Sequence, residues 1–462
     1  MKKRRFAALL LALAALPFGA CAGGGGNGSG AGSGGGAEPE PPAAVTRPLP
    51  YQYLAKFTEA ETPAFEYADG YAYGGGSEIK AIEYRGADYM GLRTKVFAYI
   101  GFPAGASAEN KVPAVVLVHG GGGTAFPEWV RAWNERGYAA ISMDTEGRRP
   151  DRSRNGLNGP ANDYLLTETK PLNEQWMYHA VSSVVLAHTL LRADERVDAG
   201  KTGFMGVSWG SVVSCVAAGI DNRFSFGVSV YGGGFLNEGS SGFSYYGISD
   251  ASWALWEPSL YFPEVKADML FVNSDHDTSF SPDITYKSAR AVGGRHTYIA
   301  VHTHGQSEAM ALTEPYIFAD ESVKGEPARA RIESAAREGD WYRGEPARAR
   351  IESAAREEGD WYRVTYSLPE GATLAGVQVY KKVLPIGYER AGLGYALPNE
   401  DFSEAKTPLM FDAPTGSFTF RIPWSARVVY FNLLTEKDGR IAVASSRLYD
   451  IEGAGQGAGN SG

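Results

Sequence analysis

Short apolar runs typical of β-strands alternate with helical patterns between residues 79 and 320. Such alternation favours an α/β class with a mainly parallel sheet covered by helices. The clearest helix spans 173–192, since its apolar residues recur at spacings of three and four and form one stripe. These residues are Trp176, Ala180, Val184, Ala187 and Leu191. The predicted strands are 79–84, 93–100, 114–119, 139–143, 202–207, 225–231, 269–273 and 296–302.

From residue 361 onward, alternating strand patterns continue without helical segments. Turn signals at Glu370-Gly371 and Asp438-Gly439 separate these patterns, as in small all-β domains. We therefore expect a small β-sandwich, immunoglobulin-like in size, over 344–452, followed by a flexible tail over 453–462. Its predicted strands are 361–367, 376–384, 417–422, 427–434 and 440–449.

A tandem duplication precedes the predicted sandwich. Residues 325–343 and 344–363 carry the same sequence except for one added Glu in the second copy. Two copies are too few for a solenoid. The second copy runs directly into the strand pattern that follows it, so we expect it to form the edge of the sandwich and the first copy to be surplus.

The N-terminal segment has the pattern of an export signal. Residues 1–20 combine a basic start with an apolar run too short to span a bilayer, and small residues precede Cys21. The cysteine in this position resembles the cleavage box of bacterial lipoproteins, which implies acylation of Cys21 and anchoring to the extracytoplasmic face of the membrane. An ordinary secretory signal is the alternative. Residues 21–50, rich in Gly and Ser and then in Pro, predict a flexible linker before a body over 51–324.

Charge and cysteine content exclude several classes of partner and cofactor. The formal net charge is −9, and without the four basic residues of the leader it is −13, from 40 basic against 53 acidic residues. This excess of acidic residues disfavours binding to nucleic acid. Cys21 and Cys215 are too few for a disulfide scaffold or a cysteine-bound metal. We therefore expect no metal and no cofactor.

A G-x-S-x-G sequence centred on Ser208 follows the predicted strand 202–207 and precedes a helical stretch. At a sharp strand-to-helix turn, glycines two residues on either side relieve crowding around a strained serine. The N-terminus of the next helix and the Trp209 N–H favour negative charge beside this serine. The context predicts a nucleophile at Ser208.

A serine nucleophile needs a base that a carboxylate orients, and in this fold type the chain order is Ser, acid, His. His302 and His304 follow a strand late in the chain, and we favour His304, with His302 as the alternative. The preceding strand ends near Asp275 and Asp277. We favour Asp277 as the acid, since Asp275 is the better placed of the two to cap the turn.

Four glycines, Gly120 to Gly123, follow the strand 114–119. Their backbone N–H groups can approach a ligand closely, as an oxyanion hole requires. A phosphate-binding loop does not fit, because no Lys-Ser/Thr pair follows and the charge is acidic.

Four segments together resemble the α/β-hydrolase superfamily, in particular its dienelactone-hydrolase, acetyl-xylan-esterase and prolyl-oligopeptidase-like branches. They are HGGGGTAF at 119–126, GVSWGS at 206–211, NSDHD at 273–277 and HTHG at 302–305. The resemblance covers about 79–320 and implies an α/β-hydrolase fold. It also implies a triad of Ser208, Asp277 and His304, with an oxyanion held by Trp209 and by Gly121 or Gly122. Ser211 stands where many relatives have a second glycine.

These features predict an exported, lipid-anchored serine carboxylic-ester hydrolase, with deacetylation of a polysaccharide as its expected reaction. A prolyl-oligopeptidase-like peptidase is the second hypothesis, but only about 80 residues precede the first sheet strand, too few for a propeller. A binding protein on an inactive hydrolase scaffold is the third. Trp253 and Trp256, in an aromatic-rich segment, either contact sugar faces or pack internally.

Overall fold

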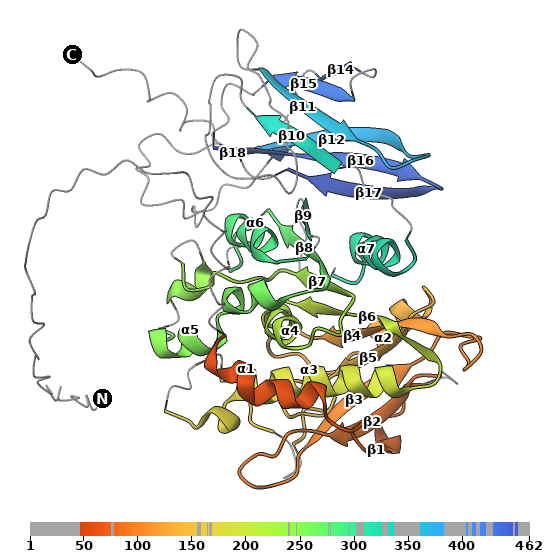
Figure 1. The fold of residues 1–462 in the computed structure, drawn as a ribbon, viewed down its shortest axis with the longest axis vertical. Helices are drawn as coiled ribbons and strands as arrows, with labels where there is room; N and C mark the ends of the chain where they lie inside the picture. The colour runs from red at the N-terminus through yellow and green to blue at the C-terminus, as the bar shows by residue number, and fades with distance from the viewer. Residues whose placement is uncertain are drawn as a thin grey trace, which may run out of the picture. The chain divides into compact units, whose positions relative to one another are not determined.

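A computed structural model gives the fold of the chain (Figure 1). It is described for residues 47–74, 78–154, 159–163, 165, 169–238, 241–245, 247–275, 277, 279–294, 296–301, 309–325, 331–336, 361–382, 403–404, 409–412, 416–421, 428–446 and 449–450. The predicted signal peptide, Cys21 and most of the predicted linker lie outside these residues, as do His302 and His304.

Nine strands form the main sheet, in the order β1-β2-β3-β5-β4-β6-β7-β8-β9. The adjacent strands β5, β4, β6, β7, β8 and β9 run parallel. Strands β1, β2 and β3 extend the sheet beyond β5 with antiparallel pairs. The mainly parallel α/β sheet predicted from the sequence is therefore confirmed. The strands are β1 Phe65–Tyr67, β2 Lys80–Arg85, β3 Lys95–Gly101, β4 Val112–Val118, β5 Ala139–Met143, β6 Val197–Val207, β7 Phe226–Val230, β8 Asp268–Ser274 and β9 His296–Val301.

Helices alternate with these strands, as the sequence pattern predicts. Trp133 of α2 packs against Tyr316 of α7 with ring centroids 4.6 Å apart, whereas α3 packs against α4 and α1. The helices are α1 Leu49–Leu54, α2 Pro127–Asn134, α3 Trp176–Ala193, α4 Trp209–Ile220, α5 Asp250–Trp256, α6 Pro282–Ala291 and α7 Glu314–Val323. Short 3₁₀ segments are Ala55–Thr58, Asp69–Tyr71, Leu172–Glu174, Gly242–Tyr245, Pro258–Leu260 and Phe262–Glu264. No helix within the described ranges has the length and apolar content needed to cross a membrane.

Helix α3 differs from its predicted single apolar stripe. It is buried on every side from Trp176 to Leu191. The sheet and α4 cover one side, while α1 and the 3₁₀ turn Ala55–Thr58 cover another. Residues N-terminal to the first sheet strand therefore complete the burial of this helix.

The C-terminal strands form two small sheets. Their order is β10-β11-β15-β14 in one and β13-β12-β16-β17 in the other, with β18 paired to β16. Side chains from both sheets share one apolar core, which includes Val364, Phe418, Phe431 and Leu433. The strands are β10 Arg331–Ala336, β11 Trp361–Ser367, β12 Thr373–Lys382, β13 Ser403–Glu404, β14 Leu409–Asp412, β15 Ser417–Arg421, β16 Val428–Lys437, β17 Arg440–Ser445 and β18 Tyr449–Asp450.

The first copy of the duplication supplies an edge strand, which differs from the expectation that it is surplus. Strand β10, from the first copy, pairs antiparallel with β11, which begins at the end of the second copy. The edge of β11 presents unpaired backbone N–H and C=O groups, and the first copy pairs with them through β10. The matching segment of the second copy, 350–355, lies outside the described residues.

Candidate active site

Ser208 occupies the turn between β6 and α4. Its backbone has φ 55° and ψ −123°, a left-handed conformation that is strained for a residue with a side chain. The turn is held because the Ser208 N–H donates to Val230 O at 2.8 Å and the Ser211 N–H donates to Ser208 O at 2.8 Å. The serine is 7 % exposed. This is the nucleophile geometry expected of a G-x-S-x-G sequence between a strand and a helix.

The two glycines of this sequence are required by close backbone contacts. A Cβ on Gly206 would lie 2.7 Å from the carbonyl carbon of Gly210, and a Cβ on Gly210 would lie 2.5 Å from the carbonyl oxygen of His119. Backbone atoms cannot yield at such distances without moving a strand. The steric reason that the sequence gives for these glycines agrees with the structure.

Ser211 has room for its side chain at the position where the resemblance implies a second glycine. Its hydroxyl lies 2.5 Å from the hydroxyl of Ser229 on β7. A Cβ on the neighbouring Gly232 would collide with this side chain. Gly232 therefore provides the space that Ser211 fills.

The glycine loop that follows β4 carries the candidate oxyanion donors. The N–H of Gly122 donates to Oε1 of Glu146 at 2.6 Å, and the N–H of Gly123 donates to the carbonyl of Gly120 at 3.0 Å. The N–H of Gly122 is thus already hydrogen-bonded to a carboxylate in this structure. Gly121 and Trp209, which begins α4, are the remaining donors of the predicted set.

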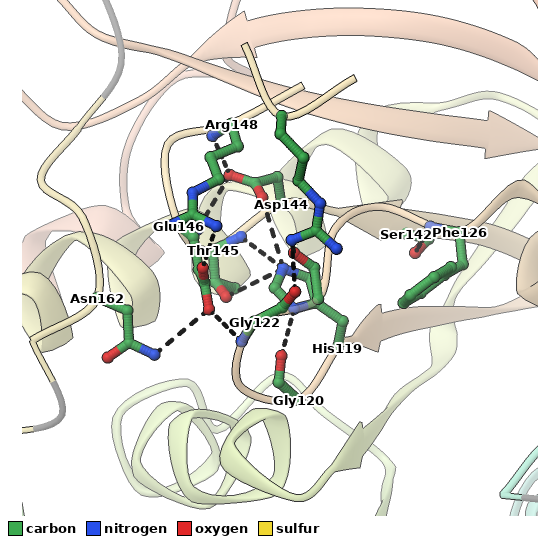
Figure 2. A network of polar contacts seen from close by, with 12 residues as sticks. His119, Gly120, Gly122, Phe126, Ser142, Asp144, Thr145, Glu146, Arg148 and Asn162 are labelled. Carbon is green, nitrogen blue, oxygen red and sulfur yellow. Dashed lines mark hydrogen bonds and ion pairs between the residues drawn. The ribbon is translucent and has the colours of Figure 1, made fainter. Parts of the chain in front are cut away.

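A buried polar network supports this loop (Figure 2). Thr145 N–H donates to His119 Nε2 at 3.0 Å, so the imidazole proton is on Nδ1, which donates to Gly120 O at 2.7 Å. Asp144 accepts the N–H of Glu146 at 2.9 Å and thereby orients that residue toward Gly122. The loop is fixed by the segment after β5.

Glu146 is 2 % exposed and its carboxylate has three partners. Besides Gly122, Oε1 lies 3.4 Å from Nδ2 of Asn162, and Oε2 lies 3.4 Å from a guanidinium nitrogen of Arg148. The sequence analysis does not identify Glu146. Its only signal is an acidic residue shortly after the buried strand 139–143, and such residues are common.

Asp277 lies in the loop after β8. Its Oδ1 accepts the N–H groups of Ser279 and Phe280, each at 2.9 Å. Burial raises the pKa of Asp277 to about 6, against the lowering effect of these two hydrogen bonds. One carboxylate oxygen thus organises the loop, a role that sequence reasoning gives to Asp275.

Asp275 directly follows β8 and is 4 % exposed. Its Oδ2 accepts a hydrogen bond of 2.7 Å from the hydroxyl of Tyr430, on β16. His276, between the two aspartates, lies outside the described residues.

Histidines His302 and His304, the candidate bases, lie outside the described residues, so the choice between them stays a prediction. The earlier histidines are structural. His179 Nε2 lies 2.8 Å from Asn173 O, and burial lowers the pKa of His179. Both His179 and His188 are buried.

His188 belongs to a second arrangement of hydroxyl, imidazole and carboxylate. Its Nδ1 lies 2.8 Å from Asp221, and its Nε2 lies 2.7 Å from the hydroxyl of Thr202. Burial acts to raise the pKa of Asp221, but hydrogen bonds from Arg223 and His188 outweigh it and hold that pKa far below its usual range. All three side chains are sealed from solvent, and the imidazole stacks on Phe224 at 3.8 Å. This set has no access for a substrate.

The tryptophans of the aromatic-rich segment pack internally. Trp253 is 6 % exposed, and Trp256 is fully buried, with its indole N–H donating to Gln175 at 2.6 Å. Neither offers a face to a sugar. Across the part of the chain that the structure describes, no three His, Cys, Asp or Glu side chains cluster as a metal site would require.

Comparison with known proteins gives one family match. Residues 77–237 match the family model of acetyl xylan esterase (AXE1). This segment includes the glycine loop and Ser208 but ends before the candidate acid and base. No curated protein matches the chain.

Several solved structures are similar. The acetyl xylan esterase from Paenibacillus sp. R4 aligns with TM-score 0.46 and 16 % identity, covering 55 % of this chain and 86 % of that one. Acetyl Xylan Esterase 1 from Thermoanaerobacterium sp. JW/SL YS485 aligns with TM-score 0.42 and 14 % identity, covering 57 % and 90 %. An acylaminoacyl peptidase from Pyrococcus horikoshii aligns with TM-score 0.40 and 19 % identity, covering 54 % of this chain and 42 % of that one.

Proposed function

We propose that the chain is a serine carboxylic-ester hydrolase that removes acetyl groups from a polysaccharide. The observation that carries the proposal is the strained Ser208 at the β6–α4 turn, inside the segment that matches the acetyl xylan esterase model. Residues with this kind of backbone strain are concentrated at active sites.

Acyl transfer would proceed in two halves. As Ser208 Oγ attacks the ester carbonyl, His304 accepts its proton, and Asp277 orients the imidazole through the oxygen not bound to Ser279 and Phe280. The N–H groups of Gly121 and Trp209 stabilise the oxyanion. The imidazolium then protonates the departing alcohol, and water, activated by the same imidazole, releases the acid and restores Ser208.

The net charge supports a neutral polymer as the substrate. At −13 after removal of the leader, the protein repels polyanions, whereas acetylated neutral polysaccharide experiences no such repulsion. The family match supports acetyl as the acyl group.

Fluorophosphonate labelling of the full chain tests the nucleophile. Wild-type protein should be labelled, Ser208→Ala should not, and the matched control Ser252→Ala, another buried serine, should be labelled like wild type. Folded wild-type protein that resists labelling would instead identify an inactive scaffold.

An ester panel then tests the substrate class. We expect acetyl esters to be cleaved faster than longer acyl esters, and acetylated xylan to release acetate. Faster cleavage of prolyl-peptide chromogens would favour a peptidase and contradict the proposal.

Export and lipid anchoring at Cys21 are part of the proposal. The basic leader, the apolar run and the cysteine after small residues support them. In a bacterial host, the wild-type chain should fractionate with membranes, and Cys21→Ser should be released. Equal fractionation of both would contradict anchoring at this residue.

A further inference from the structure

The C-terminal sandwich makes a buried contact with the loop of the candidate acid. The Tyr430 hydroxyl donates to Asp275 Oδ2 at 2.7 Å, and Tyr430 itself has no exposed surface. Asp275 is the first residue after β8, two positions before Asp277. The contact joins residues that are 155 positions apart in the chain.

Strand alternation explains why Tyr430 points away from the sandwich core. Its neighbours Val429 and Phe431 belong to that core, so Tyr430 projects from the opposite face of β16. Its cross-strand partner is Tyr380 of β12, and the two rings stack at 4.9 Å with 16° between their planes. Both tyrosines belong to the core of the hydrolase body. Around Tyr380 and Tyr430, this sheet is therefore covered on both faces.

The same sheet also contacts the strand that leads toward the candidate base. Strand β17 lies against β9, whose last residue is Val301. Nearby, the Val443 N–H donates to Glu314 at 3.2 Å, and Arg440 lies 3.3 Å from Asp320 on α7. The sandwich thus supports both chain segments that carry the late members of the predicted triad.

We propose, on the basis of the proposed function, that the β-sandwich helps to position the active site. Tyr430 is then a positioning residue for the acid loop, the loop after β8 that carries Asp277. Two backbone N–H groups fix Asp277 to its own loop, so the position of the loop sets the position of the carboxylate. Tyr430 holds that loop at Asp275, where it leaves β8. In this proposal Tyr430 acts on the loop through its hydrogen bond to Asp275.

Tyr430→Phe in the full chain tests the proposal. The variant keeps the ring and its stack on Tyr380 but removes the hydroxyl. We expect kcat for an acetyl ester to fall about tenfold with KM within about twofold, the result of losing a hydrogen bond to a buried carboxylate. We also expect the acidic limb of the pH profile to move, which a purely structural role would not cause. Tyr366→Phe, in the sandwich core against Phe418, is the matched control and should behave like wild type.

Asp275→Asn probes the contact from the other side and leaves the sandwich sequence intact. If Tyr430 acts through Asp275, the double variant loses no more kcat than the worse of the two single variants. Additive losses, or wild-type kcat and pH profile in folded Tyr430→Phe, would overturn the proposal. In that case fluorophosphonate labelling of wild type still supports the serine esterase. If wild type neither reacts with fluorophosphonate nor cleaves esters, both proposals fail together.

Discussion

Replacing Glu146 should loosen the oxyanion loop. Glu146→Ala removes the acceptor of the Gly122 N–H and the partner of Arg148; the Glu146 carboxylate is buried, whereas Gly122 is exposed and Arg148 is partly exposed. A hydrogen bond to a charged group contributes about 1.5–3 kcal/mol. If about 1.5–3 kcal/mol of loop ordering is lost in the transition state, kcat falls about tenfold to a hundredfold.

Glu146→Gln separates the charge of this side chain from its shape. The amide keeps an oxygen for the Gly122 N–H at nearly the same position, so we expect a decrease of less than about fivefold. Glu135→Gln, at an exposed ion pair with Arg131, is the control and should leave kcat unchanged. Steady-state kinetics with an acetyl ester give kcat and KM, and a thermal scan of each variant confirms that it is folded.

The opposite result would identify a different donor. If Gly122 N–H itself stabilises the oxyanion, then Glu146 competes with the substrate for it, and Glu146→Ala raises kcat. An unchanged or increased kcat in folded Glu146→Ala therefore refutes the assignment of Glu146 as support for the loop and of Gly121 as the donor.

Three further predictions concern the acid, the serine turn and the buried histidine. Because burial raises the pKa of Asp277 to about 6, kcat/KM should fall below that pH. In the folded state this group binds its proton more tightly than when unfolded, so its contribution to stability is present below pH 3.8 and lost as pH rises through 6. Asp277→Asn should thus raise the free energy of unfolding at pH 7.5 by about 1–2 kcal/mol after allowance for partial exposure, but not at pH 3.5; equal effects at both would contradict this. Gly210→Ala, with its Cβ against the backbone of His119, should lose fluorophosphonate labelling, whereas Gly74→Ala, in open space, should not; normal labelling of Gly210→Ala would show that the turn can adjust. His188→Ala should lower the free energy of unfolding in urea by about 3 kcal/mol and keep labelling, and loss of labelling in folded protein would give this histidine a catalytic role.

Local sequence rules predict the main sheet well, because its strands are short apolar runs with turn residues between them. The predicted strand 139–143 is β5 itself, and the predicted strand 225–231 differs from β7 by one residue at each end. The serine turn can also be predicted from local sequence, because its close backbone contacts require glycine at positions 206 and 210 and the sequence has Gly206 and Gly210 there. Strand β1 escapes prediction because its three residues, Phe65–Tyr67, are exposed and carry no pattern.

Contacts between distant segments are not predictable in this way. The Glu146 carboxylate accepts a hydrogen bond from Gly122, which lies in the loop after the neighbouring strand. The sequence around residue 146 does not indicate this partner. In the sequence, Tyr430 is an ordinary aromatic residue of a predicted β-strand. Only the folded structure shows its hydrogen bond to Asp275. The pair Asp275 and Asp277 shows the limit most clearly, because the two carboxylates are two residues apart and only their directions distinguish their roles.

The stacked tyrosines also bear on how the chain folds. Tyr380 and Tyr430 fill part of the core of the α/β body, yet both follow α7, the last helix among the described residues, in the sequence. During synthesis, the body remains with an open apolar surface until about a hundred further residues have left the ribosome. Ribosome-bound chains that stop before β16 should therefore be sensitive to protease and prone to aggregate, whereas chains that extend past β17 should become compact in one step.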